Sequence, residues 1–460
     1  MLAGAATSLK GPKLPGGQAY RILHAVITAR EKRLLPGSQL IIEGSKPLEG
    51  RVRVGGSKNA ADYAFAACLL TGEECVLENV PEIEDVRLMA GILVALGAEV
   101  SSEGDGVWRI RADRIDRLDA PNDLVMSQRA SFLVMGPLLA RFGRAACCSP
   151  GGDVLGMRPL DVHIDGLRAL GGRVSRQGEQ YVAELPAGQE RLRAARIFLD
   201  YPSVMGTVNL IFAAALADGK TTLVNAAAEP EILNVIDMLS AMGAKIERAA
   251  SGVLEVEGVP ALAGVRHRII ADRLETGLFA LSAAATRGEV LVEGAVAGHL
   301  DALLHKLREA GVQVEIEEDG IRVGASRQPF HSVQAQAVPY PGLATDLHPP
   351  LAAFLTQCQG VSVIHERVYE NRLLYVGELR KLGADVITAG QTAIITGPTQ
   401  LYGAVVRALD VRAGGSLVLA ALAAEGRTQI NDVYHLDRAH QDLVGKLRCL
   451  GAQVERHQDN

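Results

Sequence analysis

Aromatic side chains are scarce in this sequence: they make up 4% of its 460 residues, with a single tryptophan. Long apolar runs are absent too, since none reaches the roughly 18 residues of a membrane span. The N-terminus has no compact apolar core of the kind a signal peptide carries. We therefore expect no membrane contact and place the protein in the cytoplasm.

Cysteine and positive charge are also limited. The six cysteines mostly lie in apolar helix or strand patterns, and none forms a zinc-type pair of pairs, so we expect reduced, buried thiols. No His/Cys/Asp cluster has metal-ligand spacing, which predicts neither a metal nor an organic cofactor. The formal net charge of −6 argues against a nucleic-acid partner.

Glycine, in contrast, is abundant, with 49 residues, and part of it recurs at a fixed interval. One set follows a first, apolar helix and a second set follows an amphipathic helix, where glycine stops a helix at little cost. Successive copies are about 70 residues apart, a period typical of internal repeats. The two sets are Gly72, Gly143, Gly219, Gly288, Gly360 and Gly426, and Gly97, Gly171, Gly243, Gly311, Gly383 and Gly451. Six copies in phase predict six compact helix/strand subdomains.

The repeat leaves residues over at both ends. Residues 1–37 lie outside it, and we expect a flexible N-terminal extension without a chemical role. Two strand patterns, 38–43 and 50–54, precede the first copy, while the sixth copy reaches residue 460 before its last strand. We therefore expect the N-terminal strands to complete the sixth copy, so that the two chain ends meet in one lobe.

Polar residues stand immediately before the first helix of each copy. In any single copy they could be ordinary N-caps, the role that Ser, Thr, Asp and Asn commonly fill. Cations at the same places are unfavourable for the helix dipole, yet Lys58, Arg129, Arg273 and Arg412 all stand there. Because free N–H groups at helix starts attract anions, four such cations favour an anion-binding cleft.

One loop, residues 149–163, departs from the repeat. It combines Pro150 and three glycines with one acid, Asp153, and one arginine, Arg158. Taken alone it could be a solvated turn, but glycine loops beside a basic cleft are often lids. We therefore predict a lid that brings Asp153 to the cleft.

Nine motifs in one order, over residues 38–456, resemble the UDP-N-acetylglucosamine 1-carboxyvinyltransferases, the enolpyruvyl transferases of peptidoglycan synthesis. The related 5-enolpyruvylshikimate-3-phosphate synthases share the repeat but not the Pro-Gly-Gly loop. The motifs are Gly55-Gly-Ser-Lys58-Asn59, Arg129-Ala-Ser131, Pro150-Gly-Gly-Asp153, Gly156-Met-Arg158-Pro159, Ala271-Asp-Arg273, Thr345-Asp346-Leu347, Val368-Tyr-Glu-Asn-Arg372, Asp410-Val-Arg412 and Tyr434-His-Leu-Asp-Arg438.

The resemblance implies an α/β fold, a two-lobed inside-out α/β barrel of six subdomains with three in each lobe. One lobe would span residues 58–270, and the other would join 38–57 to 271–460. It also implies a reaction at the cleft between the lobes: the sugar 3-hydroxyl attacks C2 of phosphoenolpyruvate, C3 is protonated, and phosphate leaves from a tetrahedral ketal. The implied partners are therefore phosphoenolpyruvate and UDP-N-acetylglucosamine.

The resemblance also implies roles for single residues. Phosphoenolpyruvate would be bound by Lys58, Asn59, Arg158, Arg412 and Arg438, while Asp346 takes the proton of the sugar hydroxyl. Core packing remains an alternative for several apolar positions among the sugar-nucleotide residues. The full set of residues implied to bind UDP-N-acetylglucosamine is Asn59, Arg129, Arg158, Pro159, Leu160, Asp161, Val162, Ser203, Val204, Asp346 and Val368.

Asp153 is the main departure from the family pattern, which has a cysteine there as the acid that protonates C3. A carboxylic acid can donate a proton as well, and we expect Asp153 to take this catalytic role together with Asp346, Lys58 and Arg438. Fosfomycin alkylates that cysteine, so we expect insensitivity to it. Asp153 could instead be a bystander, and the chain a non-catalytic sensor or a transferase with another acceptor.

Overall fold

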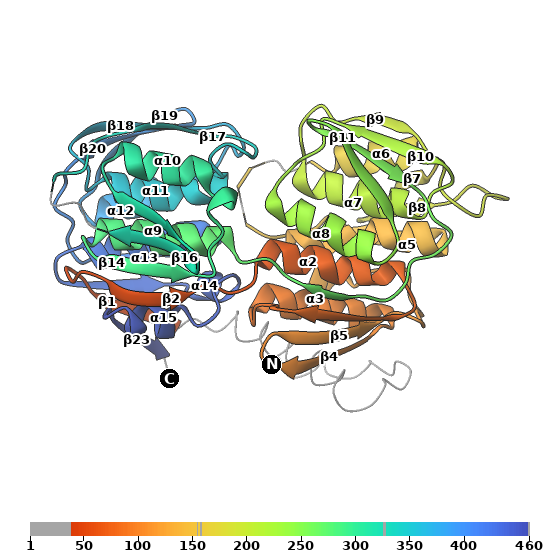
Figure 1. The fold of residues 1–460 in the computed structure, drawn as a ribbon, viewed down its shortest axis with the longest axis horizontal. Helices are drawn as coiled ribbons and strands as arrows, with labels where there is room; N and C mark the ends of the chain where they lie inside the picture. The colour runs from red at the N-terminus through yellow and green to blue at the C-terminus, as the bar shows by residue number, and fades with distance from the viewer. Residues whose placement is uncertain (1–37, 154, 157–158, 325–327, 459–460) are drawn as a thin grey trace, which may run out of the picture.

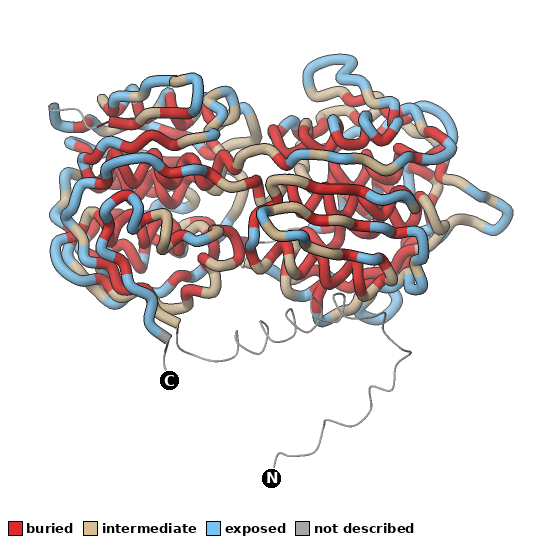
Figure 2. The backbone as a smooth tube through the Cα atoms, turned by 60° about the horizontal axis from the view of Figure 1, so that its bottom comes forward, coloured by how far each residue is buried: buried red, intermediate tan, exposed pale blue. Residues whose placement is uncertain are grey.

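The computed structural model describes residues 38–153, 155–156, 159–324 and 328–458; the extension expected at 1–37 lies outside them. Two lobes lie side by side, each around its own hydrophobic core (Figure 1). The core of the first lobe contains buried residues between Ala60 and Ile269. That of the second lobe runs from Leu40 to Val54 and from Leu274 to Val454. Figure 2 shows buried residues inside both lobes and exposed ones at the periphery.

One helix of each copy is central and buried on nearly all sides. Every residue of α9 (Arg273–Ala285) is buried, as are eight of the ten in α2 (Lys58–Ala67). A helix that is apolar all round belongs inside a core, and α9, α11 and α13 accordingly pack against one another, as α5 does against α7. The other central helices are α5 (Met135–Phe142), α7 (Val204–Ala215), α11 (His348–Leu355) and α13 (Val411–Ala423).

The second helix of each copy is amphipathic. In α10 (Asp301–Glu309) only Leu303, Leu304 and Leu307 are buried. The others are α3 (Glu84–Leu96), α6 (Asp161–Ala169), α8 (Pro230–Ala241), α12 (Tyr375–Lys381) and α15 (Leu443–Cys449). The predicted glycine follows each of these six helices with φ between 87° and 115°, which confirms the second set. In the first set only Gly143 is a helix cap; the others stand at the start of the following strand or within two residues before it.

The sheets form the outer layer of both lobes, so that helices lie inside and strands outside (Figure 1). The strands are β1 (Ser38–Glu43), β2 (Glu49–Arg53), β3 (Glu74–Glu78), β4 (Glu99–Gly104), β5 (Val107–Arg111), β6 (Arg144–Cys148), β7 (Arg173–Gln177), β8 (Gln180–Glu184), β9 (Arg196–Phe198), β10 (Lys220–Val224), β11 (Lys245–Ala250), β12 (Val253–Glu257), β13 (Arg266–Arg268), β14 (Glu289–Glu293), β15 (Gln313–Glu317), β16 (Gly320–Gly324), β17 (Gln334–Ala337), β18 (Gly360–Glu366), β19 (Asp385–Ala389), β20 (Thr392–Gly397), β21 (Val405–Arg407), β22 (Arg427–Asn431) and β23 (Gln453–Gln458). The predicted α/β fold is confirmed.

Five sheets share one topology. The strand after the central helix lies between a parallel edge strand and an antiparallel partner, in the orders β13-β3-β5-β4, β9-β10-β12-β11, β2-β14-β16-β15, β17-β18-β20-β19 and β21-β22-β1-β23. The sixth sheet, β6-β8-β7, has three strands, and a single bridge between Asp119 and Ala146 replaces its parallel edge strand. The repeat predicted from glycine spacing is therefore a repeat of structure.

The N-terminal strands do not both complete the sixth copy. β1 does, because it pairs antiparallel with β22 and β23. β2 instead pairs parallel with β14 in the fourth copy, so the expectation was wrong for this strand. β13 makes the reverse exchange: it directly precedes the fourth copy but pairs with β3 of the first. Parallel pairing joins strands distant in sequence, and glycine spacing carries no signal for it.

Within the described residues, the chain passes between the lobes at two places that lie side by side. Gly56 forms an antiparallel bridge with Ala271. The Ser57 amide donates to the Ile270 carbonyl at 2.7 Å, and the Asp272 amide donates to the Gly55 carbonyl at 2.9 Å. The two passages thus form one hydrogen-bonded junction, which leads directly into α2 and α9.

Two further expectations concern cysteines and membranes. All six cysteines are free thiols, five of them buried, whereas Cys449 is exposed and corrects the expectation for that residue. No helix in the described part of the chain is both long and apolar enough to span a bilayer.

Candidate active site

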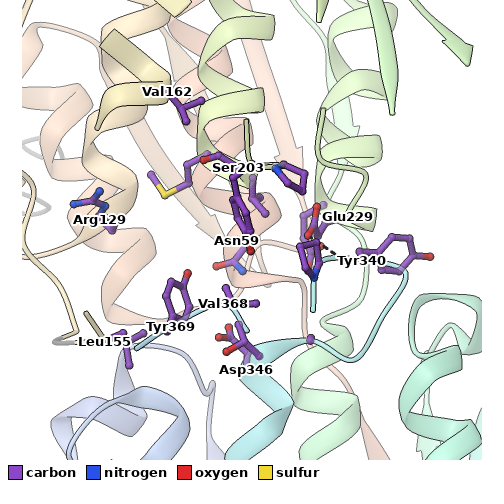
Figure 3. Close-up of a pocket in the computed structure, with 18 of the residues that line it drawn as sticks. Asn59, Arg129, Leu155, Val162, Ser203, Glu229, Tyr340, Asp346, Val368 and Tyr369 are labelled. Atoms are coloured by element: carbon purple, nitrogen blue, oxygen red, sulfur yellow. Dashed lines mark hydrogen bonds between the residues drawn. The ribbon is translucent and has the colours of Figure 1, made fainter. Parts of the chain in front are cut away.

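A cavity of about 830 Å³ lies between the lobes. The first lobe lines it with the starts of α2 and α7, with α6 and with part of the loop 149–163; the second contributes the start of α9 and the segments 338–346 and 367–372. Figure 3 shows Asn59 of the first lobe beside Val368 of the second, with Ser203 on one side of this pair and Asp346 on the other. Such a volume suits a ligand larger than a simple metabolite.

Lys58 and Arg438 meet on one carboxylate at the junction of the lobes. The Lys58 ammonium lies 3.0 Å from Asp85 and 3.2 Å from Asp62, one helical turn further along α2. Arg438 follows the short helix α14 (Tyr434–Asp437), and its Nε and Nη2 donate to the two oxygens of Asp85 at 3.0 and 3.2 Å. Two cations from different lobes therefore converge on a volume the size of one carboxylate.

The two aspartates of this cluster have opposite pKa shifts. Burial raises the pKa of Asp62 to about 6, because Lys58 offsets the lost hydration only in part. Burial also acts to raise the pKa of Asp85, but Lys58 and Arg438 together outweigh it and lower that pKa to about 2. Asp85 therefore stays ionised and holds both cations in place.

Asp346 lies in a second basic group. It belongs to a 3₁₀ turn, Thr345–Leu347, before α11. Arg372 Nη2 donates to its Oδ1 at 2.8 Å, and Arg412 Nε donates to its Oδ2 at 3.0 Å. Burial alone would raise the pKa of Asp346, but Arg412 and Arg372 outweigh it and hold that pKa well below its ordinary value. Both oxygens are thus charged acceptors with arginine donors.

The described part of the loop 149–163 reaches across to the second lobe. Asp153 accepts a hydrogen bond from Arg438 Nη1, and its Oδ1 lies 3.8 Å from His435 Nδ1. The Asn371 amide donates to the Leu155 carbonyl at 3.1 Å. Gly156 has φ 122°, and a side chain there would collide with Glu370. The loop thus spans the cleft with Asp153 at the cation cluster.

Most of the residues that the sequence predicts for the sugar nucleotide line this cavity. They are Asn59, Arg129, Pro159, Asp161, Val162, Ser203, Val204, Asp346 and Val368. Leu160 does not line it: its side chain is buried in the core of the first lobe. Arg158, predicted for both substrates, lies outside the described residues.

The polar residues before the helices serve both of the readings that the sequence allows. Ser57, Ser203, Asp272 and Asp410 cap helices, and the Asp272 carboxylate accepts from two backbone amides of α9. Lys58, Arg273 and Arg412, the cations beside Ser57, Asp272 and Asp410, line the cavity. So does Arg129, whose helix start has no side-chain cap. Capping and cleft formation are therefore complementary.

Sequence reasoning missed several polar residues of the site. Glu231 accepts from Arg273 across the lobes at 2.9 Å, and Glu229, which is 8% exposed, lies beside the Tyr340 amide (Figure 3). Asp62 could have been found from its position four residues after Lys58. No local pattern signals Asp85, because it belongs to α3.

The arrangement offers cations, carboxylates and a closing loop rather than a metal. Among the described residues, no three His, Cys, Asp or Glu side chains are grouped to hold an ion. A cleft with Lys58, Arg412 and Arg438 suits an anionic small molecule. Two carboxylates that line it, Asp153 and Asp346, offer groups for proton transfer.

Comparisons with known proteins show the family of the chain. Residues 42–447 match the family model of EPSP synthase (3-phosphoshikimate 1-carboxyvinyltransferase). The chain is 42% identical over 419 residues to UDP-N-acetylglucosamine 1-carboxyvinyltransferase 1 of Caldanaerobacter subterraneus subsp. tengcongensis, covering 91% of this chain and 99% of the relative. It is 44% identical over 421 residues to the UDP-N-acetylglucosamine 1-carboxyvinyltransferase of Maricaulis maris, covering 92% and 99%.

Solved structures show the same fold. The enolpyruvyl transferase NikO from Streptomyces tendae superposes with a TM-score of 0.83 at 25% identity, over 93% of this chain and 100% of that one. EPSP synthase from Acinetobacter baumannii superposes with a TM-score of 0.75 at 18% identity, over 92% and 100%; at that identity the likeness concerns the fold alone.

Proposed function

Because the chain belongs to the EPSP synthase family, and within it to the UDP-N-acetylglucosamine 1-carboxyvinyltransferases, we propose that it transfers the enolpyruvyl group of phosphoenolpyruvate to the 3-hydroxyl of UDP-N-acetylglucosamine and releases phosphate. The observation that carries the proposal is the convergence of Lys58 and Arg438 on one carboxylate in the cleft. A three-carbon donor with a phosphate and a carboxylate needs cations that converge in this way.

The donor would bind by exchanging partners with the carboxylates of the site. Lys58 now contacts Asp62 and Asp85, and Arg438 contacts Asp85 and Asp153. Asp85 can keep both cations aligned while their remaining N–H groups turn to the donor phosphate and carboxylate, since an ammonium has three donors and a guanidinium five. Arg412, and Arg158 outside the described residues, are proposed to complete the donor site.

Asp346 is proposed as the base for the acceptor hydroxyl. Its low pKa makes it a weak base as long as Arg412 and Arg372 both hold it. If Arg412 turns to the donor anion, Asp346 loses one of its two cations and its pKa rises. Donor binding would thereby activate the base, and the sugar 3-hydroxyl would lose its proton to Asp346 as its oxygen bonds to C2.

Asp153 is proposed as the acid of the same step. As the sugar oxygen bonds to C2, the C2–C3 double-bond electrons take the Asp153 proton at C3. In the second step the C2–O bond to phosphate breaks, phosphate departs with the bonding electrons, and C3 returns a proton to Asp153. Asp153 must therefore leave Arg438 and enter the reaction protonated, which requires the loop 149–163 to shift.

The same residue underlies a proposed insensitivity to fosfomycin, the epoxide that alkylates the cysteine usual at this place in the family. A thiolate is a strong nucleophile, whereas a carboxylate paired with Arg438 is a weak one. The remaining cysteines are poor substitutes. Burial raises the pKa of the Cys147 thiol well above its ordinary value, and the neighbouring Cys148 thiol is buried too, with its pKa also raised by burial.

The proposed setting follows from the substrates. UDP-N-acetylglucosamine and phosphoenolpyruvate are cytoplasmic metabolites, so we propose a cytoplasmic enzyme of peptidoglycan synthesis with small-molecule partners and without nucleic acid. The residues that the structure describes, from residue 38 onward, form two lobes, each with its own core. The reaction written above needs neither a metal nor an organic cofactor.

Phosphate release from phosphoenolpyruvate tests the function directly. The purified chain is given UDP-N-acetylglucosamine in one reaction and shikimate 3-phosphate in another, because the matched family model is that of a 3-phosphoshikimate transferase. We expect release with the nucleotide sugar alone. Release with shikimate 3-phosphate would assign another acceptor, and specific binding of the sugar without release would make the chain a sensor.

A further inference from the structure

Glu366, the last residue of β18, is fully buried behind the wall of the cavity and accepts four hydrogen bonds. Its Oε1 accepts from the amides of Val368 and Tyr369 at 2.8 and 3.2 Å. Its Oε2 accepts from Thr345 Oγ1 at 3.0 Å and from His348 Nδ1 at 2.8 Å. One carboxylate therefore joins two segments that both line the cavity.

The direction of each hydrogen bond follows from charge. Burial alone would raise the pKa of Glu366, but the hydrogen bonds from His348 and Val368 outweigh it and lower that pKa, so the side chain is an ionised acceptor. Burial lowers the pKa of His348, which is therefore a neutral ring with its proton on Nδ1. The Thr345 hydroxyl must likewise direct its only hydrogen to Glu366.

This arrangement fixes the orientation of Asp346. With its hydrogen on Glu366, the Thr345 oxygen is free to accept, and Arg372 Nε donates to it at 3.1 Å. Arg372 is 1% exposed, and its Nη2 donates to Asp346 Oδ1 at 2.8 Å. Because a guanidinium is planar and rigid, holding its Nε at Thr345 also sets the angle at which Nη2 meets Asp346.

The other oxygen of Glu366 shapes the acceptor side. The two backbone amides that donate to this oxygen hold residues 366–369 in a bend, and the bend presents Val368 and Tyr369 to the cavity (Figure 3). The same segment continues to Asn371, whose amide holds the Leu155 carbonyl of the loop 149–163.

We propose that Glu366 is a positioning residue, which aligns the base Asp346 through Thr345 and Arg372 and aligns the acceptor wall through Val368 and Tyr369. The inference rests on the proposed function of the same cavity. It assigns the two oxygens of one buried carboxylate to two separable tasks, the base and the wall.

Glu366→Gln separates these tasks. The amide oxygen of glutamine can still accept the hydrogen bonds from the backbone N–H groups of Val368 and Tyr369. Its NH₂ group, in contrast, is a donor that faces Thr345, so the Thr345 hydroxyl must rotate its hydrogen away. We expect kcat to fall about 10- to 100-fold, because small misplacements of a reacting group cost this much, with KM for the acceptor within twofold. Glu366→Ala removes both ties, so KM should rise as well. Unchanged kcat in the Gln variant would overturn the proposal.

A double-mutant cycle with Thr345→Val tests the route. Valine keeps the shape of threonine but removes the hydroxyl, so it should lower kcat to a similar extent. If Glu366 acts through Thr345, the kcat of the double variant should lie within about twofold of the kcat of the slower single variant. Multiplying effects would refute this route.

Glu378→Gln serves as the matched control. Glu378 is also a buried glutamate of the second lobe. It accepts from the Arg407 amide at 2.9 Å and pairs with Lys381, and neither of these partners lines the cavity. We expect its kcat within twofold of wild type. A drop equal to that of Glu366→Gln would indicate a general effect of loosening the lobe and overturn the positioning role.

The kinetic test uses whichever acceptor supports phosphate release by the wild type, so a different acceptor would refute the proposed function and leave this inference testable. A crystal structure of Glu366→Gln gives a readout without turnover. We expect the 2.8 Å contact between Arg372 and Asp346 to be lost or lengthened. An unchanged contact would overturn the inference.

Discussion

Replacing Asp62 by asparagine should stabilise the free protein at neutral pH, although it removes an ion pair. Asp62 is 1% exposed and lies 3.2 Å from Lys58. Burial raises its pKa from 3.8 to about 6, so ionising it in the folded state costs more than Lys58 returns. Asparagine has nearly the same shape and needs no ionisation.

The expected magnitude follows from linkage between protonation and folding. A folded pKa above the unfolded one means that stability is fully present below the unfolded value and is lost as pH rises through the folded value. A shift from 3.8 to about 6 corresponds to about 3 kcal/mol. Asp62→Asn should therefore gain up to about 3 kcal/mol at pH 8, roughly half of that at pH 5, and nothing below pH 4.

Asp85→Asn is the matched control, since it alters the neighbouring aspartate on the same Lys58. The pKa of Asp85 is lowered from 3.8 to about 2. Its contribution to folding stability is therefore present above the pKa of the unfolded chain and is lost as the pH falls through the folded pKa. The linked loss at pH 8 is about 2 kcal/mol, and unpaired Lys58 and Arg438 add to it.

The assay is guanidinium unfolding of both variants and wild type, without ligand, at pH 5 and pH 8. The two substitutions should move the midpoint in opposite directions at pH 8. If Asp62→Asn destabilised the protein as Asp85→Asn does, or if its gain were independent of pH, the assignment of opposite shifts to the two aspartates would be wrong.

Three further predictions concern catalysis. Wild type should keep its activity after incubation with fosfomycin. Asp153→Cys should turn over without the drug but lose its activity with time in the presence of fosfomycin. Time-dependent inactivation of wild type would contradict the role given to Asp153. Gly156→Ala should lower kcat about 10-fold, because a side chain there strains the backbone and meets Glu370, whereas Gly377→Ala, with open space around it, should not. Arg438→Lys should raise KM for phosphoenolpyruvate at least about 10-fold through loss of the planar fork, with KM for the acceptor as the internal comparison.

Local sequence signals predicted the repeat but not the exchange of strands between copies. The six glycines after the amphipathic helices have the conformation that their spacing implied, because a helix end is a local event. The pairing of β2 with β14 and of β13 with β3 joins segments about 200 residues apart, and edge strands of three to five residues carry little periodicity.

The same distinction applies to the site. The cations at helix starts could be read from the sequence because their position conflicts with the helix dipole. The carboxylates that hold them could not, since Asp85 and Glu231 come from other helices of the first lobe. Burial was another feature that local sequence did not reveal: Pro159 and Asp161 line the cavity, whereas the Leu160 side chain between them is buried in the core.

The hydrogen-bonded junction of the two inter-lobe passages has a mechanical consequence. It ends at the first residues of α2 and α9, where Lys58 and Arg273 stand. A rotation of one lobe about this junction displaces atoms in proportion to their distance from the pivot. Lys58, next to the fulcrum, therefore changes place least, whereas cavity residues farther from the junction move through longer arcs.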